Sequence, residues 1–269
     1  MSFHHVITEN ALVPSMCRTT GILACLLMLV PIRSEQFPSR NPDRMRGLPP
    51  LVLWAWERPE DLRFINPQTT AVAFLAGTIR IHGDDVAFHP RFQSLLVADH
   101  AKLVAVVRIE VDRDATLDRS QIDQAATAIA KQALLPRVVA VQIDFDATRS
   151  QREFYRALLR DLRRRLGSSM PTSITALASW CLDDDWISSL PIDEAVPMLF
   201  RLGAGTNEVV GQLTSGRDFR PLICRGSLGL STDERWTSLP AGRRLYVFQP
   251  RPWTEQAELA FLWEVHEWR

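Results

Sequence analysis

An apolar run that ends in two acids, at residues 138–147, most strongly limits what this chain can fold into. Its first residues, Val-Val-Ala-Val-Gln-Ile, form no alternation of apolar and polar positions, which predicts a strand buried on both faces. A basic amphipathic helix is predicted directly afterwards, over 150–166. Because parallel α/β proteins place their chemistry at the carboxyl ends of strands, Asp144 and Asp146 mark the predicted site.

Strand-like and helix-like segments alternate from Leu51 to the end of the chain. Eight strands are predicted, at 51–56, 70–76, 103–110, 138–144, 173–177, 195–200, 221–224 and 244–249, with a hairpin at 78–88 that turns at 82–85. Helices are predicted at about 120–134 (capped by Asp118 or Ser120), 150–166, 207–213 and 252–266 (capped by Thr254), with helical turns at 59–62 and 232–236. This order predicts α/β class and a single (β/α)8 TIM-like barrel, and a doubly wound open sheet is the alternative.

The N-terminal part of the chain is predicted to lie outside the barrel. An uncharged apolar run at 20–32 is flanked by Arg18 and Arg33, and it is short for a membrane span but suits a signal sequence. The sequence therefore divides into a signal or anchor segment at 1–33, a polar, proline-rich linker at 34–50, and a barrel domain at 51–269. We expect an exported protein, periplasmic or membrane-anchored, that contacts a membrane only through the N-terminal segment. The alternative is an apolar first helix of a cytoplasmic protein.

Composition and motifs exclude several classes of function. The formal net charge is zero, which argues against nucleic acid as a partner. The sequence has no dinucleotide-binding, phosphate-loop or nucleophilic-serine motif, and its six histidines form no metal-binding pair, so we expect no cofactor and no metal. The four cysteines have no metal-ligand spacing, and Cys181 and Cys224 are expected to be buried free thiols.

Acids at the predicted strand ends supply the candidate catalytic residues, Asp144, Asp146 and Glu57. Asp144 and Asp146 have the same side-chain parity, so both can point into the mouth of the barrel. Repulsion between them would raise one pKa enough to hold a proton at neutral pH, which acid/base work on a glycosidic bond requires. The alternative is that each carboxylate pairs with a nearby arginine and orders the loop.

Aromatic and charged residues near the same strand ends are candidate substrate-binding groups, because an indole ring stacks on the apolar face of a sugar. They are Trp54, Trp56, Glu110, Trp180, Arg201 and Glu234. The alternatives are that the two strand-end tryptophans belong to the core and that Glu110 belongs to a structural ion-pair network. We expect a carbohydrate or another small molecule as the partner.

Four ordered segments resemble a bacterial family, domain of unknown function 3142. They are 53–62 (LWAWERPEDL), 142–147 (QIDFDA), 173–177 (SITAL) with Trp180, and 196–203 (VPMLFRLG), so the resemblance covers roughly 51–268. It implies a barrel-like, exported protein and brings no particular activity.

A weaker resemblance is to chitinase-like glycoside hydrolases, which carry an Asp-x-Asp-x-Glu pattern at the end of the fourth barrel strand. Asp144 and Asp146 match its two aspartates, and Thr148 stands in the place of the acid glutamate. Threonine cannot donate the proton that a leaving sugar needs. Two functions therefore remain open, besides a different hydrolase or lyase chemistry: a glycoside-hydrolase-like enzyme that uses the three acids above, and a catalytically silent barrel that binds a glycan or another cell-envelope ligand.

Overall fold

The computed structural model describes residues 42–182, 184–203, 206–236 and 238–268. The described residues all belong to one compact unit of the chain. The predicted signal segment at 1–33 lies outside the described residues. Within the described ranges, no helix has the length and apolar character that crossing a membrane requires.

Eight parallel strands form a closed barrel, as the alternation of segments predicts. Each strand pairs with the next, and the last, β11, pairs with β1, which excludes an open sheet. The barrel strands are β1 (Leu51–Ala55), β3 (Thr70–His82), β6 (Leu103–Val111), β7 (Val138–Asp144), β8 (Thr172–Leu177), β9 (Glu194–Met198), β10 (Ser227–Ser231) and β11 (Arg244–Phe248). A separate two-stranded sheet joins β2 (Glu60–Leu62) to β5 (Leu95–Val97).

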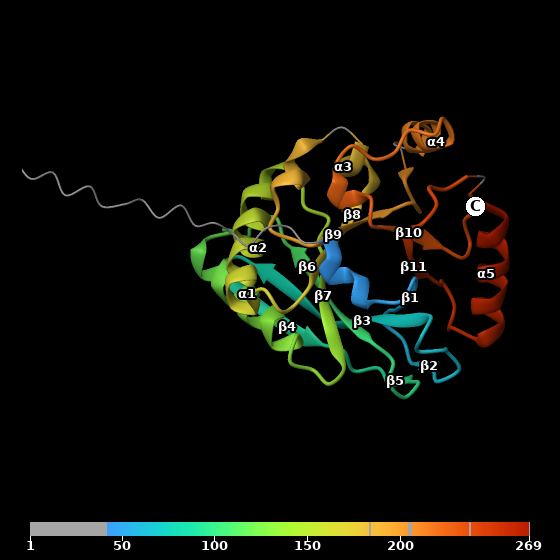
Figure 1. The fold of residues 1–269 in the computed structure, drawn as a ribbon. Helices are drawn as coiled ribbons and strands as arrows, with labels where there is room; N and C mark the ends of the chain where they lie inside the picture. The colour runs from blue at the N-terminus through green and yellow to red at the C-terminus, as the bar shows by residue number, and fades with distance from the viewer. Residues whose placement is uncertain (1–41, 183, 204–205, 237, 269) are drawn as a thin grey trace, which may run out of the picture. The chain divides into compact units, whose positions relative to one another are not determined.

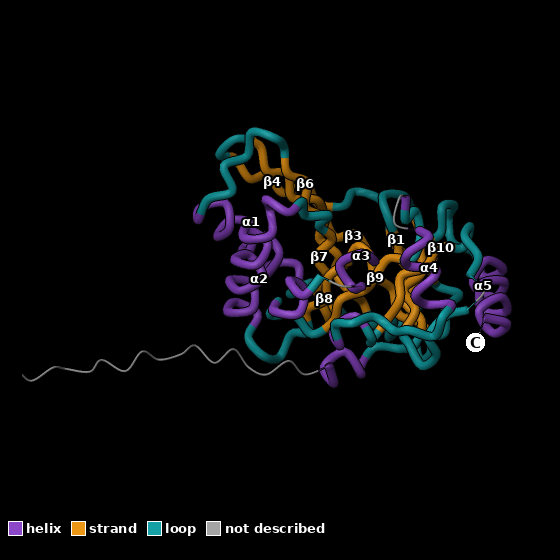
Figure 2. Tube along the Cα trace, turned by 90° about the horizontal axis from the view of Figure 1, so that it is seen from above, coloured by secondary structure: helices purple, strands orange, loops and turns teal. Residues whose placement is uncertain are grey.

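Helices cover the outside of the barrel. The elements that the structure describes are η1 (Pro42–Gly47), α1 (Arg119–Gln132), η2 (Arg149–Gln151), α2 (Arg152–Leu166), α3 (Ala178–Leu182), η3 (Asp185–Ser189), α4 (Thr206–Thr214), η5 (Leu222–Cys224) and α5 (Glu255–Trp268). Helices α1 and α2 lie side by side, and α5 lies on the opposite side of the strands (Figures 1 and 2). Asp118 caps α1 as predicted, since its side chain accepts from the backbone N–H of Gln121 at 2.9 Å.

The barrel interior is filled by Trp54, whose ring spans the space between opposite strands. Its indole N–H donates to Gln142 Oε1 at 2.9 Å, and its ring centroid lies 5.5 Å from that of Tyr246. Gly229 on β10 makes room for this ring, because a Cβ atom there would lie 3.1 Å from Trp54. Met45 and Leu48 close the N-terminal end of the barrel and pack into the same inner cluster. The end of the predicted linker therefore belongs to the barrel.

A buried polar network also lies at the N-terminal end of the strands. Glu194 accepts from Arg244 at 2.6 Å and from the Tyr246 hydroxyl at 3.0 Å. Burial raises the pKa of Glu194, and the Arg244 charge opposes that rise. Groups at this end of a barrel serve stability, because the loops that form active sites lie at the other end.

Strand β3 is longer than its neighbours and carries part of the sheet beyond the barrel. It has 13 residues, and its second half pairs with β6 and, antiparallel, with β4 (Asp85–Pro90), as the hairpin pattern predicts. We call this three-stranded extension, residues 78–90 and 108–111, the ledge; Figure 2 shows β4 and β6 there at one edge of the molecule. A register shift next to Gly77 begins it, where a Cβ atom would lie 2.4 Å from the Phe88 ring.

Three predicted elements differ from the structure. The seventh barrel strand is Ser227–Ser231, whereas 221–224 contains the short turn η5. The strand was hidden because its inward positions carry serine and glycine, which the space taken by Trp54 requires. Residues 232–236 form no described helix, and Trp236 packs inward with its N–H donating to the Leu199 carbonyl. Residues 60–62 form β2, although a proline before them favoured a helical turn.

The expected free thiols are instead a disulfide. Cys181, at the end of α3, and Cys224, in η5, are bonded with their Cα atoms 5.9 Å apart. They are separated by 43 residues, so their spacing gave no sign of the pairing. The loop that follows barrel strand β8 is therefore tied to the segment that precedes strand β10.

Helix α5 turns only part of its apolar residues toward the barrel. Phe261 and Val265 are buried, whereas Leu259, Leu262 and Trp263 are exposed. The apolar positions of this helix extend around most of its surface, so their pattern could not select the inward face.

Candidate functional site

The C-terminal mouth of the barrel gathers side chains that continue the inward-facing positions of the strands. Asp144 follows Gln142 on the inner face of β7, and Arg108 is its register partner on β6. Thr175 on β8 donates its hydroxyl to Asp144 Oδ1 at 2.7 Å. Three neighbouring strands therefore bring a cation, a carboxyl group and a hydroxyl to one place.

Asp144 is largely shielded from solvent, and this burial raises the pKa of its carboxyl group. The Thr175 hydrogen bond and the Arg108 charge lower that pKa, whereas the negative charges of Asp146 and Glu110 add to the rise. Burial has the largest effect because it removes water from the charged form. Asp144 is thus placed to hold a proton at a pH where an ordinary aspartate has lost it.

Asp146 lies on the open side of the same site. It is exposed, yet protein around its carboxyl group removes enough solvent to raise its pKa, and Arg108 opposes the effect. A cavity of about 210 Å³ brings the two acids together; it is lined by Arg108, Ile109, Val111, Asp144, Phe145, Asp146, Thr148 and Gln151. Asp144 and Asp146 therefore line the same cavity.

Thr148 forms part of the turn that leads into α2. Its backbone N–H donates to Gln151 Oε1 at 2.8 Å, and its hydroxyl lies 3.1 Å from that of Ser150. The position that matches the acid glutamate of chitinase-like barrels is thus a helix-initiating residue, and it offers no acidic proton.

Glu57 does not join the two aspartates. It is exposed after β1 and lines a different cavity of about 300 Å³, formed with Arg80, His89 and Arg91 of the ledge and the loop after it. The structure therefore does not bring the third candidate acid into the cavity of the first two.

The three candidate tryptophans have different surroundings. Trp54 is 3% exposed inside the barrel, and Trp180 is 5% exposed with its ring edge against Trp186. Both belong to the core, which was the alternative interpretation for Trp54. Trp56 is only partly buried and packs on top of the inner cluster at the mouth.

Two phenylalanines that no sequence pattern singled out, Phe200 and Phe248, also pack against that inner cluster. Phe200, two residues after β9, and Phe248, the last residue of β11, stack with their ring centroids 5.8 Å apart and an interplanar angle of 3°. The guanidinium of Arg201 lies 5.3 Å from the Phe248 ring centroid. Both rings continue the inward-facing alternate positions of their strands, and that alternation is the sequence signal that could have identified them.

The charged candidates Glu234, Arg201 and Glu110 are engaged with protein groups. Both carboxylate oxygens of Glu234 accept from the backbone N–H of Arg201, at 3.0 and 3.2 Å. Glu110 lies 3.0 Å from Arg80 Nε and 3.2 Å from Arg108 Nε, which is the ion-pair network given as its alternative. Glu234 therefore holds a loop in place, and the Arg201 side chain stays exposed above the aromatic rings.

Tyr155 is a buried neighbour of the two acids that no sequence pattern indicated. Its side chain is fully buried, and its hydroxyl has no hydrogen-bond partner among the described residues. Burial raises its pKa well above the usual value, and the charges of Asp144 and Asp146 add to the rise. The hydroxyl is thus an unused donor close to the acid pair.

Comparison with known proteins finds one family model that matches part of the chain and one similar solved structure. No curated protein matches the chain. Among solved structures, the chitinase domain of the spore coat protein CotE from Clostridium difficile is similar, with 15% sequence identity and a TM-score of 0.39 over 62% of this chain. The match covers 52% of that protein, so this chain spans about half its length. The family model of domain of unknown function 3142 matches residues 99–200, which contain β6 to β9 and both site aspartates, and so confirms the resemblance to that family over this range.

Proposed function

We propose that this protein is a glycoside-hydrolase-like barrel that binds a carbohydrate at its C-terminal mouth and uses Asp144 and Asp146 as its acid/base groups. The observation that carries this proposal is the pair itself: a shielded carboxyl group beside an accessible one in a single cavity. Two environments that differ in this way give the two carboxyl groups different pKa values, so that one can donate a proton while the other is ionised.

The difference in burial assigns a role to each acid. Asp144 is the more shielded, so it is the group that keeps its proton and donates it to the glycosidic oxygen. Asp146 faces solvent and the Arg108 charge, so it is the better candidate for the ionised partner. Its negative charge would stabilise the positive charge that develops on the sugar ring as the bond breaks.

The aromatic rings at the mouth support a carbohydrate as the ligand. Trp56, Phe200 and Phe248 are partly exposed there, and a sugar ring packs its apolar face on such surfaces. Arg201 adds an exposed donor above Phe248 for hydroxyl or acidic groups of the glycan.

A catalytically silent glycan-binding barrel is the second candidate, and Thr148 is the observation that favours it. That residue starts a helix where chitinase-like enzymes carry their acid. The same mouth would then hold a glycan without breaking it.

Turnover and thermal stability, measured on one panel of oligosaccharides, separate these proposals. We expect Asp144→Asn and Asp146→Asn each to reduce hydrolysis at least 100-fold while the variants stay folded and still bind. Asp99→Asn, an exposed aspartate before β6, is the matched control and should match the wild type. Binding without hydrolysis in the wild type would establish the silent barrel, whereas binding that survives Trp56→Ala and Phe248→Ala together would contradict both proposals.

We also propose that the protein is exported. The Cys181–Cys224 disulfide supports this, because such bonds persist in oxidising compartments and are rare in the cytosol. The apolar run at 20–32 agrees with it. A fusion to a reporter that is active only after export should be active with the full chain and inactive without residues 1–33; activity confined to the cytosol would reject export.

A further inference from the structure

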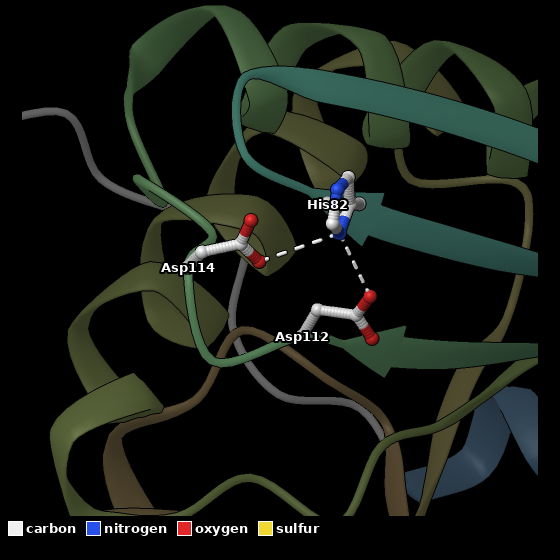
Figure 3. A group of neighbouring side chains, drawn as sticks. All are labelled: His82, Asp112 and Asp114. Atoms are coloured by element: carbon white, nitrogen blue, oxygen red, sulfur yellow. Dashed lines mark hydrogen bonds and ion pairs between the residues drawn. The ribbon is translucent and has the colours of Figure 1, made fainter.

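Three side chains with metal-ligating atoms meet at the tip of the ledge, away from the carboxyl pair. His82 is the last residue of β3, and Asp112 follows the last residue of β6. The strand register pairs Ile81 with Val111, so the residues that follow them, His82 and Asp112, lie next to each other. Asp114 reaches the same point from the loop that follows (Figure 3).

The three ligand atoms converge on one volume. His82 Nδ1 lies 2.9 Å from Asp112 Oδ2 and 3.4 Å from Asp114 Oδ1. One ligand atom of each residue lies within 4.8 Å of the others. An ion with ligands at about 2.1 Å in tetrahedral geometry has ligand atoms roughly 3.4 Å apart, so small movements of these exposed side chains would complete its shell.

Backbone contacts fix the two segments that carry the ligands. The Thr116 N–H donates to the Gly83 carbonyl at 3.1 Å, and the Gln121 side chain donates to the same carbonyl at 2.7 Å. The loop after β6 is thus tied to the hairpin turn before any ion binds. The ligands therefore need little ordering when an ion arrives.

Negative charge at this tip is incompletely neutralised by protein. Within the described ranges, the ion pairs of Asp112 and Asp114 are those with His82. Asp85, the register partner of His82 on β4, adds another carboxylate. A divalent cation would compensate this excess of acid.

We propose that His82, Asp112 and Asp114 bind one divalent transition-metal ion of the Zn²⁺ type, which fastens the hairpin turn to the loop after β6. The histidine nitrogen decides the class of ion, because Ca²⁺ and Mg²⁺ take oxygen ligands whereas Zn²⁺ combines imidazole with carboxylate. Three protein ligands leave a fourth position for water. No metal was predicted from the sequence because these residues follow no motif spacing and meet only through strand pairing.

Calorimetric titration of the chelator-treated full chain with ZnCl₂ tests this site. His4, His5, Cys17 and Cys25 are first replaced by Ala and Ser, because they could bind zinc elsewhere. We expect one ion per chain, with affinity at least tenfold weaker in Asp112→Asn and in His82→Ala. His89→Ala, which removes another exposed histidine of the ledge, is the control and should stay within twofold.

Hydrogen exchange gives a second, independent readout of where zinc binds. Saturating Zn²⁺ should slow amide exchange at 82–85 and 112–116 at least fivefold and leave the barrel strands unchanged. Thermal unfolding of each zinc-free variant should match the parent, since all three ligands are exposed. The proposal would be overturned if the parent and Asp112→Asn bound zinc with equal affinity. It would also be overturned if Zn²⁺ slowed amide exchange only outside residues 82–85 and 112–116.

Discussion

Thr175 donates a hydrogen bond of 2.7 Å to Asp144, across the carboxyl ends of β8 and β7. The bond joins two inward-facing positions of adjacent strands, so the register of the barrel sets it. It lowers a pKa that burial raises. This opposition between burial and a single hydroxyl makes the protonation of Asp144 sensitive to substitution, and it leads to the first two predictions.

Asp144→Asn is expected to stabilise the protein at pH 7. The pKa of Asp144 is raised in the folded state. Between the unfolded-state and folded-state pKa values, the folded protein therefore binds a proton that the unfolded chain has lost. The free energy of unfolding consequently falls as the pH rises through that window. The amide has no proton to lose. We therefore expect a higher free energy of unfolding in Asp144→Asn at pH 7, because the variant avoids the proton uptake that accompanies folding of the wild type. Urea unfolding at pH 7 and at pH 3.5 checks this, because the gain must vanish below the unfolded pKa; an equal gain at both values would contradict burial of an ionisable group.

Thr175→Val is expected to raise the pKa of Asp144 further, because it removes the hydroxyl that favours the charged carboxylate. The loss of this bond to a charged group should also cost about 1.5–3 kcal/mol at pH values where Asp144 is ionised. NMR titration of the Asp144 carboxyl carbon measures the shift. Thr172→Val, at the other end of β8, is the matched control, and an unmoved or lowered pKa in Thr175→Val would show that the bond does not act on Asp144.

Much of the fold followed from local pattern. The run at 138–143 shows no alternation of apolar and polar positions, which is the pattern of a strand that is covered on both faces, here by the barrel interior and the outer helices. Asp144 was found by the same argument, because it is the first charge after that run. Its partner Thr175 was not, because a threonine in an apolar strand looks like an ordinary strand former.

The elements that were missed depend on contacts between distant segments. Strand β10 has small residues at its inward-facing positions because Trp54, far away in the sequence, occupies the space next to Gly229. The Cys181–Cys224 bond and the meeting of His82 with Asp112 likewise arise from strand order. Glu57 seemed equivalent to Asp144 by its place after a strand, but the extended β3 and β4 give it a separate cavity.

Gly229→Ala is expected to destabilise the barrel. Its Cβ would lie 3.1 Å from the Trp54 ring and 3.3 Å from the Met198 Cα atom, and the backbone neighbour cannot rotate away. Overpacking of this kind costs about 1–3 kcal/mol. Chemical denaturation measures the loss, and Gly211→Ala, where the added atom meets nothing within 4 Å, is the control. A Gly229→Ala variant as stable as the control would mean that Trp54 does not fill the barrel as described.

Removal of the disulfide through Cys181→Ser with Cys224→Ser should cost about 2–4 kcal/mol. The bond closes a loop across 43 residues, and a loop of that size restricts the unfolded chain by roughly 4 kcal/mol in the chain-entropy model. Both sulfur atoms are buried, so the two serines also leave hydroxyl groups without solvent. The wild type treated with a reductant isolates the bond from that second effect, because it keeps both sulfur atoms. If reduction leaves the unfolding midpoint unchanged, the bond contributes nothing to stability, and its value as support for export is lost as well.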